Sequence, residues 1–248
     1  MTASLWDQRI ARAEELADSH RAARDILRFY AKIAGLQKIV HAALTSAASP
    51  RPDASVLLPH FPALFNLVRR DGPPPLAQSA AQLATRPDQW QPLLADQDAP
   101  EAQAFFARAL LQPYFEFQAS QNTIATNTVQ PACPFCGERP VVAVLRGEGE
   151  GGKRSLVCSL CATEWEFRRL LCPNCGEEKE RSLPVYVASE FPHVRVEACD
   201  TCRTYIKSVD LTRNGLAVPV VDELATVALN LWAADHDYVK FQPNLLGM

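Results

Sequence analysis

The eight cysteines constrain this 248-residue chain more than any other feature, because none of them stands alone. They form four Cys-x-x-Cys pairs: Cys133/Cys136, Cys158/Cys161, Cys172/Cys175 and Cys199/Cys202. The first fifteen residues mix charged and apolar side chains where a secretion signal needs an apolar run, so we expect a cytoplasmic protein. Disulfides are rare in that reducing compartment, and paired cysteines there serve as metal ligands or redox centres.

The pairs are of two kinds, which alternate along the chain. The first and third read Cys-Pro-x-Cys-Gly, whereas the second and fourth lack that proline and glycine and continue as Cys-x-Thr. The gap between Cys136 and Cys158 is 21 residues, and the gap between Cys175 and Cys199 is 23. These matching patterns indicate one unit of about 40 residues that occurs twice.

The chemistry of a Cys-Pro-x-Cys-Gly turn suits a metal ligand. Proline presets its own φ and glycine accepts a positive φ, so the turn can aim both sulfurs at one point. Two such turns facing each other across a short hairpin give a tetrahedral four-sulfur cage, which suits zinc or a single iron. We assign four ligands to each of two metal sites: Cys133, Cys136, Cys158 and Cys161, then Cys172, Cys175, Cys199 and Cys202. The spacing does not choose between iron and zinc.

Two other interpretations of the pairs are less favoured. If the pairs bound no metal, each small hairpin module would have few core residues and no cross-link to stabilise it. A thioredoxin-like redox pair opens a helix after a βαβ strand. The flanking runs here, such as Val141–Leu145 and Val194–Val196, are short and β-prone instead.

Other motifs carry less weight. Gly147–Lys153 matches the phosphate-loop spacing, but Arg154 stands where a magnesium-binding Ser or Thr belongs, so we predict a hairpin tip. His193 is predicted to be a strand or turn histidine, because both cages are already filled by cysteine. Asp222 and Glu223 are predicted to be acidic charges in the first turn of a helix. We therefore predict no catalytic residue and no enzyme.

The remaining patterns predict an α+β protein. Apolar residues recur every three or four positions from residue 4 to about 48, prolines limit residues 49–100 to brief helices, and a further helix is expected over 101–119. We predict a helical domain (1–125), a first metal module (131–170), a second metal module (171–213), and a C-terminal helix and tail (214–248) that pack on the rest. The two modules are expected to be rubredoxin-like or zinc-ribbon units in tandem.

Charge and hydropathy limit the partners. The chain has 25 Lys+Arg against 28 Asp+Glu, which gives no electrostatic reason to expect a nucleic acid or an anionic membrane. No run of about 18 uncharged apolar residues occurs, so we expect no membrane span. A protein partner is favoured, and the oligomeric state is not indicated.

Five segments carry a family resemblance: Cys133–Pro140, Cys158–Trp165, Glu197–Lys207, Pro219–Ala225 and Gln242–Leu246. They resemble the formate dehydrogenase accessory protein family, FdhE, densely from about residue 131 onward. The resemblance implies a helical domain followed by two rubredoxin-like modules, rubredoxin-type iron on the eight cysteines, and a cytoplasmic role in making formate dehydrogenase active. It also implies binding to the catalytic subunit of that enzyme. Asp237 departs from the glycine that many members carry before Tyr238.

Three functions compete at this stage. The leading one is an accessory protein that docks on immature formate dehydrogenase, with Phe135, Glu164, Trp165 and Tyr205 expected to line its docking surface. For Trp165, as for Trp232 and Tyr238, a place in the core is favoured over an interface contact. The second is a rubredoxin-like electron carrier or redox sensor. The third is a nucleic-acid-binding zinc ribbon, which the 12 Lys+Arg and 12 Asp+Glu of residues 131–214 disfavour, since each four-thiolate site with a divalent metal adds negative charge.

Overall fold

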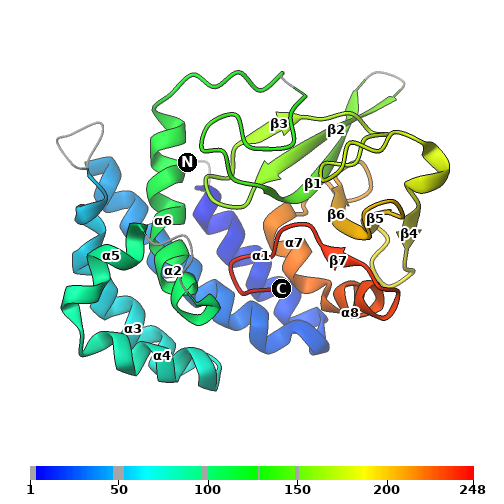
Figure 1. Cartoon of the computed structure of the whole chain (residues 1–248). Coiled ribbons are helices and arrows are strands. Elements are labelled where there is room, and N and C mark those ends of the chain that lie inside the picture. The colour runs from blue at the N-terminus through cyan, green and yellow to red at the C-terminus, as the bar shows by residue number, and fades with distance from the viewer. Residues whose placement is uncertain (1–3, 47–52, 96–99, 128, 149–150) are drawn as a thin grey trace.

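The computed structural model describes residues 4–46, 53–95, 100–127, 129–148 and 151–248. A helical half is followed by a twisted sheet and two closing helices, as Figure 1 shows. The predicted α+β class, with a helical half followed by a sheet region that carries two cysteine clusters and by a helical C-terminal segment, is confirmed. Within the described residues, no helix combines the length and the apolar character that a membrane span requires.

In the described part of the N-terminal half there are six α-helices: α1 Leu5–Ser19, α2 Arg24–Ser46, α3 Phe61–Asp71, α4 Pro74–Ala84, α5 Trp90–Ala95 and α6 Glu101–Ser120. Ser4 begins α1 with a capping box, in which its side chain accepts from the Asp7 N–H. Pro74 and Pro75 open α4, where a missing N–H costs nothing. The apolar stripe predicted over residues 4–48, of which 47 and 48 lie outside the described part, is split in two, because the chain leaves the helix at His20 and passes through a short 3-10 turn, Arg21–Ala23.

Among the residues that the structure describes, seven strands form one sheet: β1 Pro140–Glu148, β2 Gly151–Cys158, β3 Glu164–Glu166, β4 Val185–Val187, β5 Val194–Cys199, β6 Thr204–Asp210 and β7 Val239–Lys240. Their order is β3-β2-β1-β6-β5-β4, with β7 beside the first residues of β6. Within each repeat the neighbours run antiparallel. The repeats are joined by a parallel pairing of β1 with β6, in which Ala143 lies opposite Ser208. Two hairpin units thus share one continuous sheet.

The two faces of the sheet have different covers. Valines of β1, β5 and β6, such as Val144, Val196 and Val209, point to the face that α8 (Val227–Asp235) covers through Leu229 and Ala233. Ala143, Leu156 and Ile206 point to the opposite face, where they pack with Trp165 and the first group of cysteines. On that face α6 contributes Leu111, Phe115 and Ala119 as further cover.

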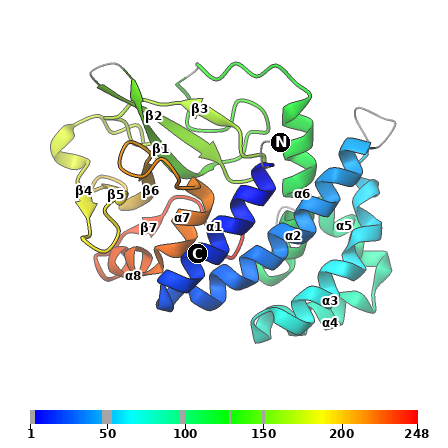
Figure 2. The ribbon, with the colours of Figure 1, turned by 180° about the vertical axis from the view of Figure 1, so that it is seen from behind.

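Helix α7 (Pro219–Ala225) ties the sheet to the helical half. Its Val221 and Leu224 pack with α1 and α2, and the rear view in Figure 2 shows α1 lying between α7 and α2. A single closing helix was expected after Pro219, but the chain turns at Thr226 and starts α8. Asp222 stands in the first turn of α7, as predicted, whereas Glu223 follows that turn, and both are buried.

Buried ion pairs surround those two carboxylates. Asp222 accepts hydrogen bonds from Arg12 of α1 (Nη2–Oδ1 2.6 Å) and from His193 beside β5 (Nε2–Oδ1 2.8 Å). Glu223 lies 2.8 Å from Nζ of Lys207 in β6 and 2.5 Å from Nζ of Lys240 in β7. Through Asp222 and Glu223 of α7, Arg12 near the start of the chain and Lys240 near its end are therefore linked to His193 and Lys207 of the second repeat.

Candidate metal centres

The structure gathers the eight cysteines into the two groups that the spacing predicted. Within each group the four sulfurs lie within 4.8 Å of one another, and all eight cysteines are free thiols. The Cys133–Cys161 and Cys136–Cys158 sulfurs are 3.5 and 3.4 Å apart. The Cys172–Cys202 and Cys175–Cys199 sulfurs are 3.7 and 3.6 Å apart. Four sulfurs at about 2.3 Å from a zinc ion sit about 3.8 Å apart at tetrahedral geometry, so both groups have nearly the dimensions of a metal cage.

The turns that carry the cysteines repeat from one unit to the other. Gly137 and Gly176 follow the first and third pairs with φ of +80° and +74°, and each donates its N–H to the carbonyl of the first cysteine of its turn. The positive φ that the sequence predicted is therefore present.

The second and fourth turns also contain a residue with positive φ, but that residue is not glycine. Ala162 and Arg203, each directly after the last cysteine of its pair, adopt φ of 54° and 55° without being glycine. This conformation costs a side-chain-bearing residue about 1–3 kcal/mol and persists only where the surroundings impose it. The same positive φ at equivalent positions indicates that both turns need it to aim their two sulfurs at one point. Neither alanine nor arginine marks such a position in the sequence.

Polar groups of the turns point at the sulfurs. The N–H groups of Phe135 and Leu160 donate to Cys133 and Cys158, each at 3.4 Å. The threonine of each Cys-x-Thr lies beside the preceding cysteine, with Thr163 Oγ1 3.1 Å from Cys161 Sγ and Thr204 Oγ1 3.0 Å from Cys202 Sγ. The backbone N–H donors favour the thiolate, which is the form that binds metal.

Without a cation, the four thiols of the first group divide their protons unequally. Hydrogen bonds from the Cys136 and Cys158 thiols lower the pKa of Cys133, whereas hydrogen bonding to Cys133 and Cys136 raises the pKa of Cys158. A bound divalent cation would stabilise all four thiolates of Cys133, Cys136, Cys158 and Cys161, so its binding would release protons and depend on pH.

The donor set fits two metal ions. Each group offers four cysteine sulfurs at tetrahedral spacing, the first group largely buried and the second partly exposed, and tetrahedral S4 sites take zinc or iron. Cys133, Cys136, Cys158 and Cys161 would hold one ion, and Cys172, Cys175, Cys199 and Cys202 the other. Such an ion would supply a fixed link between the two turns of each unit, and with iron also a site for one-electron chemistry.

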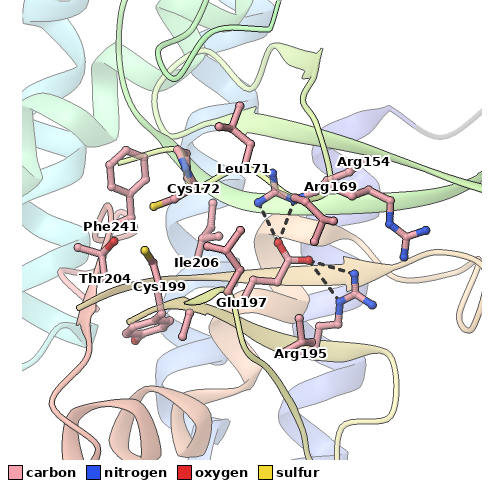
Figure 3. Close-up of a pocket in the computed structure, with 16 residues that line it drawn as sticks. Arg154, Arg169, Leu171, Cys172, Arg195, Glu197, Cys199, Thr204, Ile206 and Phe241 are labelled. Carbon is pink, nitrogen blue, oxygen red and sulfur yellow. Dashed lines mark hydrogen bonds and ion pairs between the residues drawn. The ribbon is translucent and has the colours of Figure 1, made fainter. Parts of the chain in front are cut away.

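A cleft of about 400 Å³ opens beside the second group of cysteines. Figure 3 shows the sulfurs of Cys172 and Cys199 at one end, and the Glu197 carboxylate between the guanidinium groups of Arg154 and Arg195 at the other. Burial opposes ionisation of Glu197, but the two arginines outweigh it and lower its pKa. The cleft thus has apolar walls, a charge-paired end and a sulfur-lined end.

Comparisons with known proteins agree with these features. Family models described as the central and the C-terminal domain of FdhE match residues 132–169 and 170–246. The chain is 30% identical over 202 residues to a protein FdhE homolog of Aquifex aeolicus, covering 79% of this chain and 71% of that protein. The chain belongs to the FdhE family.

Two further FdhE proteins show the extent of the likeness. A homolog from Stutzerimonas stutzeri is 34% identical over 151 residues, which are 59% of this chain and 49% of that protein. The crystal structure of the FdhE protein from Pseudomonas aeruginosa superimposes with a TM-score of 0.75 at 25% sequence identity, covering 99% of this chain and 97% of that chain. The resemblance drawn from the cysteine motifs is confirmed, and the fold likeness extends it to the helical half.

Several residues singled out from the sequence of this FdhE family member lie elsewhere. His193 is held by Asp222 in a turn before β5, away from both cysteine groups. Gly147 pairs with Gly152 across the β1–β2 hairpin, as predicted, although residues 149–150 lie outside the described part. Two of the four residues expected at the docking surface do not lie there, because Trp165 and Tyr205 are only 1% and 4% exposed, and for Trp165 the favoured prediction of a core position is confirmed. Their rings fill the two faces of the sheet instead.

Proposed function

We propose that this FdhE family protein is a non-enzymatic accessory protein of formate dehydrogenase, and that it acts in the cytoplasm by binding the catalytic subunit of that enzyme. The observation that carries the proposal is family membership together with two four-cysteine groups held in one continuous sheet. A sheet clamped at two points presents a rigid surface, and rigidity lowers the ordering cost of binding.

We place the docking surface at the edge of the sheet formed by β4. The N–H groups of Ala198 and Asp200 donate to the carbonyls of Pro184 and Ser182 at 3.0 and 2.9 Å, so alternate residues from 182 onward face β5. The backbone groups of Val185 and Val187 then point away from β5. No other strand of the described residues pairs with this edge.

The side chains at this edge suit a protein partner. Val187 is 69% exposed, and Val185, half-exposed, lines the cleft beside the second cysteine group. An open edge with apolar side chains is a template for an added strand, in which backbone hydrogen bonds supply affinity and side-chain contacts supply specificity. The occupant we propose is an extended segment of the catalytic subunit with apolar side chains at alternate positions.

Capture of the purified catalytic subunit on the immobilised metal-loaded chain tests both parts of the proposal. The wild-type chain is expected to bind, Val187→Asp to weaken binding about tenfold or more by placing a charge at the apolar edge, and Leu216→Asp to have no effect. Leu216 is the matched control because it is equally apolar and 84% exposed, but lies in the turn after β6. Absence of wild-type binding would contradict the function, whereas equal binding of both variants would contradict only the docking edge.

The metal in both sites is proposed to be iron, on the strength of the family resemblance and the four-sulfur donor sets. Protein purified without oxygen is expected to be red, with close to two irons per chain. A colourless protein with two zinc ions would leave docking intact but remove the second candidate function, a rubredoxin-like electron carrier or redox sensor. A reversible one-electron change of the bound iron would favour that second function.

A further inference from the structure

The two cysteine groups differ in exposure although their turns are alike. In the first group Cys133, Cys158 and Cys161 are buried and Cys136 is half-buried. In the second group Cys175 is exposed and Cys202 half-buried, while Cys172 and Cys199 are buried. Cys136 and Cys175 occupy the same place in the two Cys-Pro-x-Cys-Gly turns, so they report directly on this difference.

The first group is part of the hydrophobic core. It packs among Trp165, Phe167, Ile206 and Leu156, and Phe115 of α6 lies against the same cluster. Helix α6 also binds the turn between Cys158 and Cys161 directly. Gln112 Nε2 donates to the Ser159 carbonyl at 2.9 Å, and Arg108 Nη2 donates to the Ser159 hydroxyl at 3.0 Å. Opening this cage requires α6 to separate from the sheet.

The second group lacks such a cover within the described residues. Asn174, Cys175 and Gly176 of its first turn are all exposed. The cleft of about 400 Å³ reaches Cys172 and Cys199 from the other side. A space of this size accepts a small molecule. An outside ligand can therefore approach the second cage from the turn and from the cleft without disturbing the core.

We propose that the second cage is a metal-exchange site, whereas the first cage is a permanent staple. The Cys175 sulfur leaves first, an incoming thiolate or chelating ligand takes its place, and the released Cys175 thiolate takes a proton from solvent. No electron is transferred. Repetition of this substitution at Cys202 and then at the two buried cysteines passes a divalent, thiolate-preferring metal ion to or from the chain. This activity goes beyond formate dehydrogenase binding and does not require it.

Zinc release from the full-length chain loaded with two zinc ions tests the proposal. Excess 4-(2-pyridylazo)resorcinol is expected to remove one zinc quickly and the other at least about tenfold more slowly, because only the second requires opening of the core. N-ethylmaleimide added after the fast phase is expected to label Cys175 and the other three cysteines of its cage, as peptide mass spectrometry reports. Release of both ions in a single phase, or labelling of the first cage before the second, would overturn the proposal.

Two pairs of variants sharpen the test. Cys175→Ser is expected to abolish the fast phase and keep the slow one, while the matched Cys136→Ser abolishes the slow phase. If Cys136→Ser does not fold, Phe115→Ala replaces it, because this change thins the cover of the first cage without touching a ligand. Phe115→Ala is expected to speed up the slow phase alone. An acceleration confined to the fast phase would show that the cages had been assigned the wrong way round.

Discussion

The buried carboxylate of Glu223 allows a quantitative test of what holds the sheet to the tail of the chain. Its side chain is 0% exposed and lies between the ammonium groups of Lys207 and Lys240. Burial opposes ionisation of Glu223, but the two ammonium groups outweigh it and lower its pKa from 4.5 to about 2. That lowering corresponds to about 3 kcal/mol of stability, fully present above pH about 4.5 and lost as the pH falls towards 2.

Lys207 contributes in the opposite direction. Burial lowers its pKa from 10.5 to about 8, although Glu223 counteracts this. The charged form therefore costs about 3 kcal/mol at neutral pH, a cost that disappears as the pH rises from 8 to 10.5. The Glu223 and Lys207 contributions nearly cancel, yet removal of one partner leaves an uncompensated buried charge. Glu223→Gln is accordingly expected to destabilise the protein by about 3–5 kcal/mol at pH 7.

Urea unfolding of the metal-saturated protein, followed by far-ultraviolet circular dichroism, measures this difference. The control is Glu178→Gln, which breaks the exposed Arg168–Glu178 pair and is expected to cost less than about 1 kcal/mol. A cost below about 1 kcal/mol for Glu223→Gln would refute the reasoning, because the buried pair would then behave like a surface pair.

The pH dependence gives a second check on the same variant. Without Glu223 the pKa of Lys207 falls further below 8. As the pH rises, Lys207 of the variant therefore loses its buried charge, and the variant regains stability, at a lower pH than in the wild-type protein. The penalty of Glu223→Gln is therefore expected to be larger at pH 6 than at pH 9. A penalty that is the same at both pH values would show that Lys207 is not the group left uncompensated.

Three further outcomes follow from the metal sites and the core. Gly176→Ala and Gly137→Ala are each expected to destabilise the protein by about 1–2 kcal/mol, because alanine disfavours the positive φ at these positions; steric contact adds nothing, since an added Cβ meets no atom within 4 Å. Gly35→Ala inside α2 is expected to stabilise the protein by about 0.5–1 kcal/mol. Thermal unfolding of the three variants measures these differences. Trp165→Ala empties a fully buried site and is expected to cost about 3–5 kcal/mol in urea unfolding. Removal of both metals with a strong chelator should abolish β-sheet circular dichroism while much of the helical signal remains, and an unchanged spectrum would contradict a structural role for the metals.

The cysteine grouping was predictable because it depends on local information. Each turn is specified by residues within a few positions, and the repeated gaps between the turns select the partners. The brief helices also followed from local signals: α3 and α4 begin near prolines and stop after about three turns. The division into separate modules at residues 131, 171 and 214 stays a prediction, which limited proteolysis of the metal-loaded chain can check.

The remaining features depend on distant residues. Arg12 binds Asp222 across 210 positions, so no pattern around Asp222 distinguishes a buried carboxylate from an ordinary helix-start charge. A core position was the favoured prediction for Trp165 and is confirmed, but its partner could not be predicted, because the indole N–H reaches the carbonyl of Gln130, 35 positions away, at 2.8 Å. The pairing of β1 with β6 is likewise a long-range choice, since either strand could have remained an edge.

That parallel pairing has a consequence for work on isolated fragments. A peptide that contains only one repeat would carry a bare strand, β1 or β6, whose backbone donors and acceptors have lost their neighbour. Such a peptide would be expected to precipitate or to form dimers through the exposed strand even when fully loaded with metal. A fragment for study must therefore contain at least both repeats, and the weakness of a single repeat in solution would say nothing about the strength of its metal site.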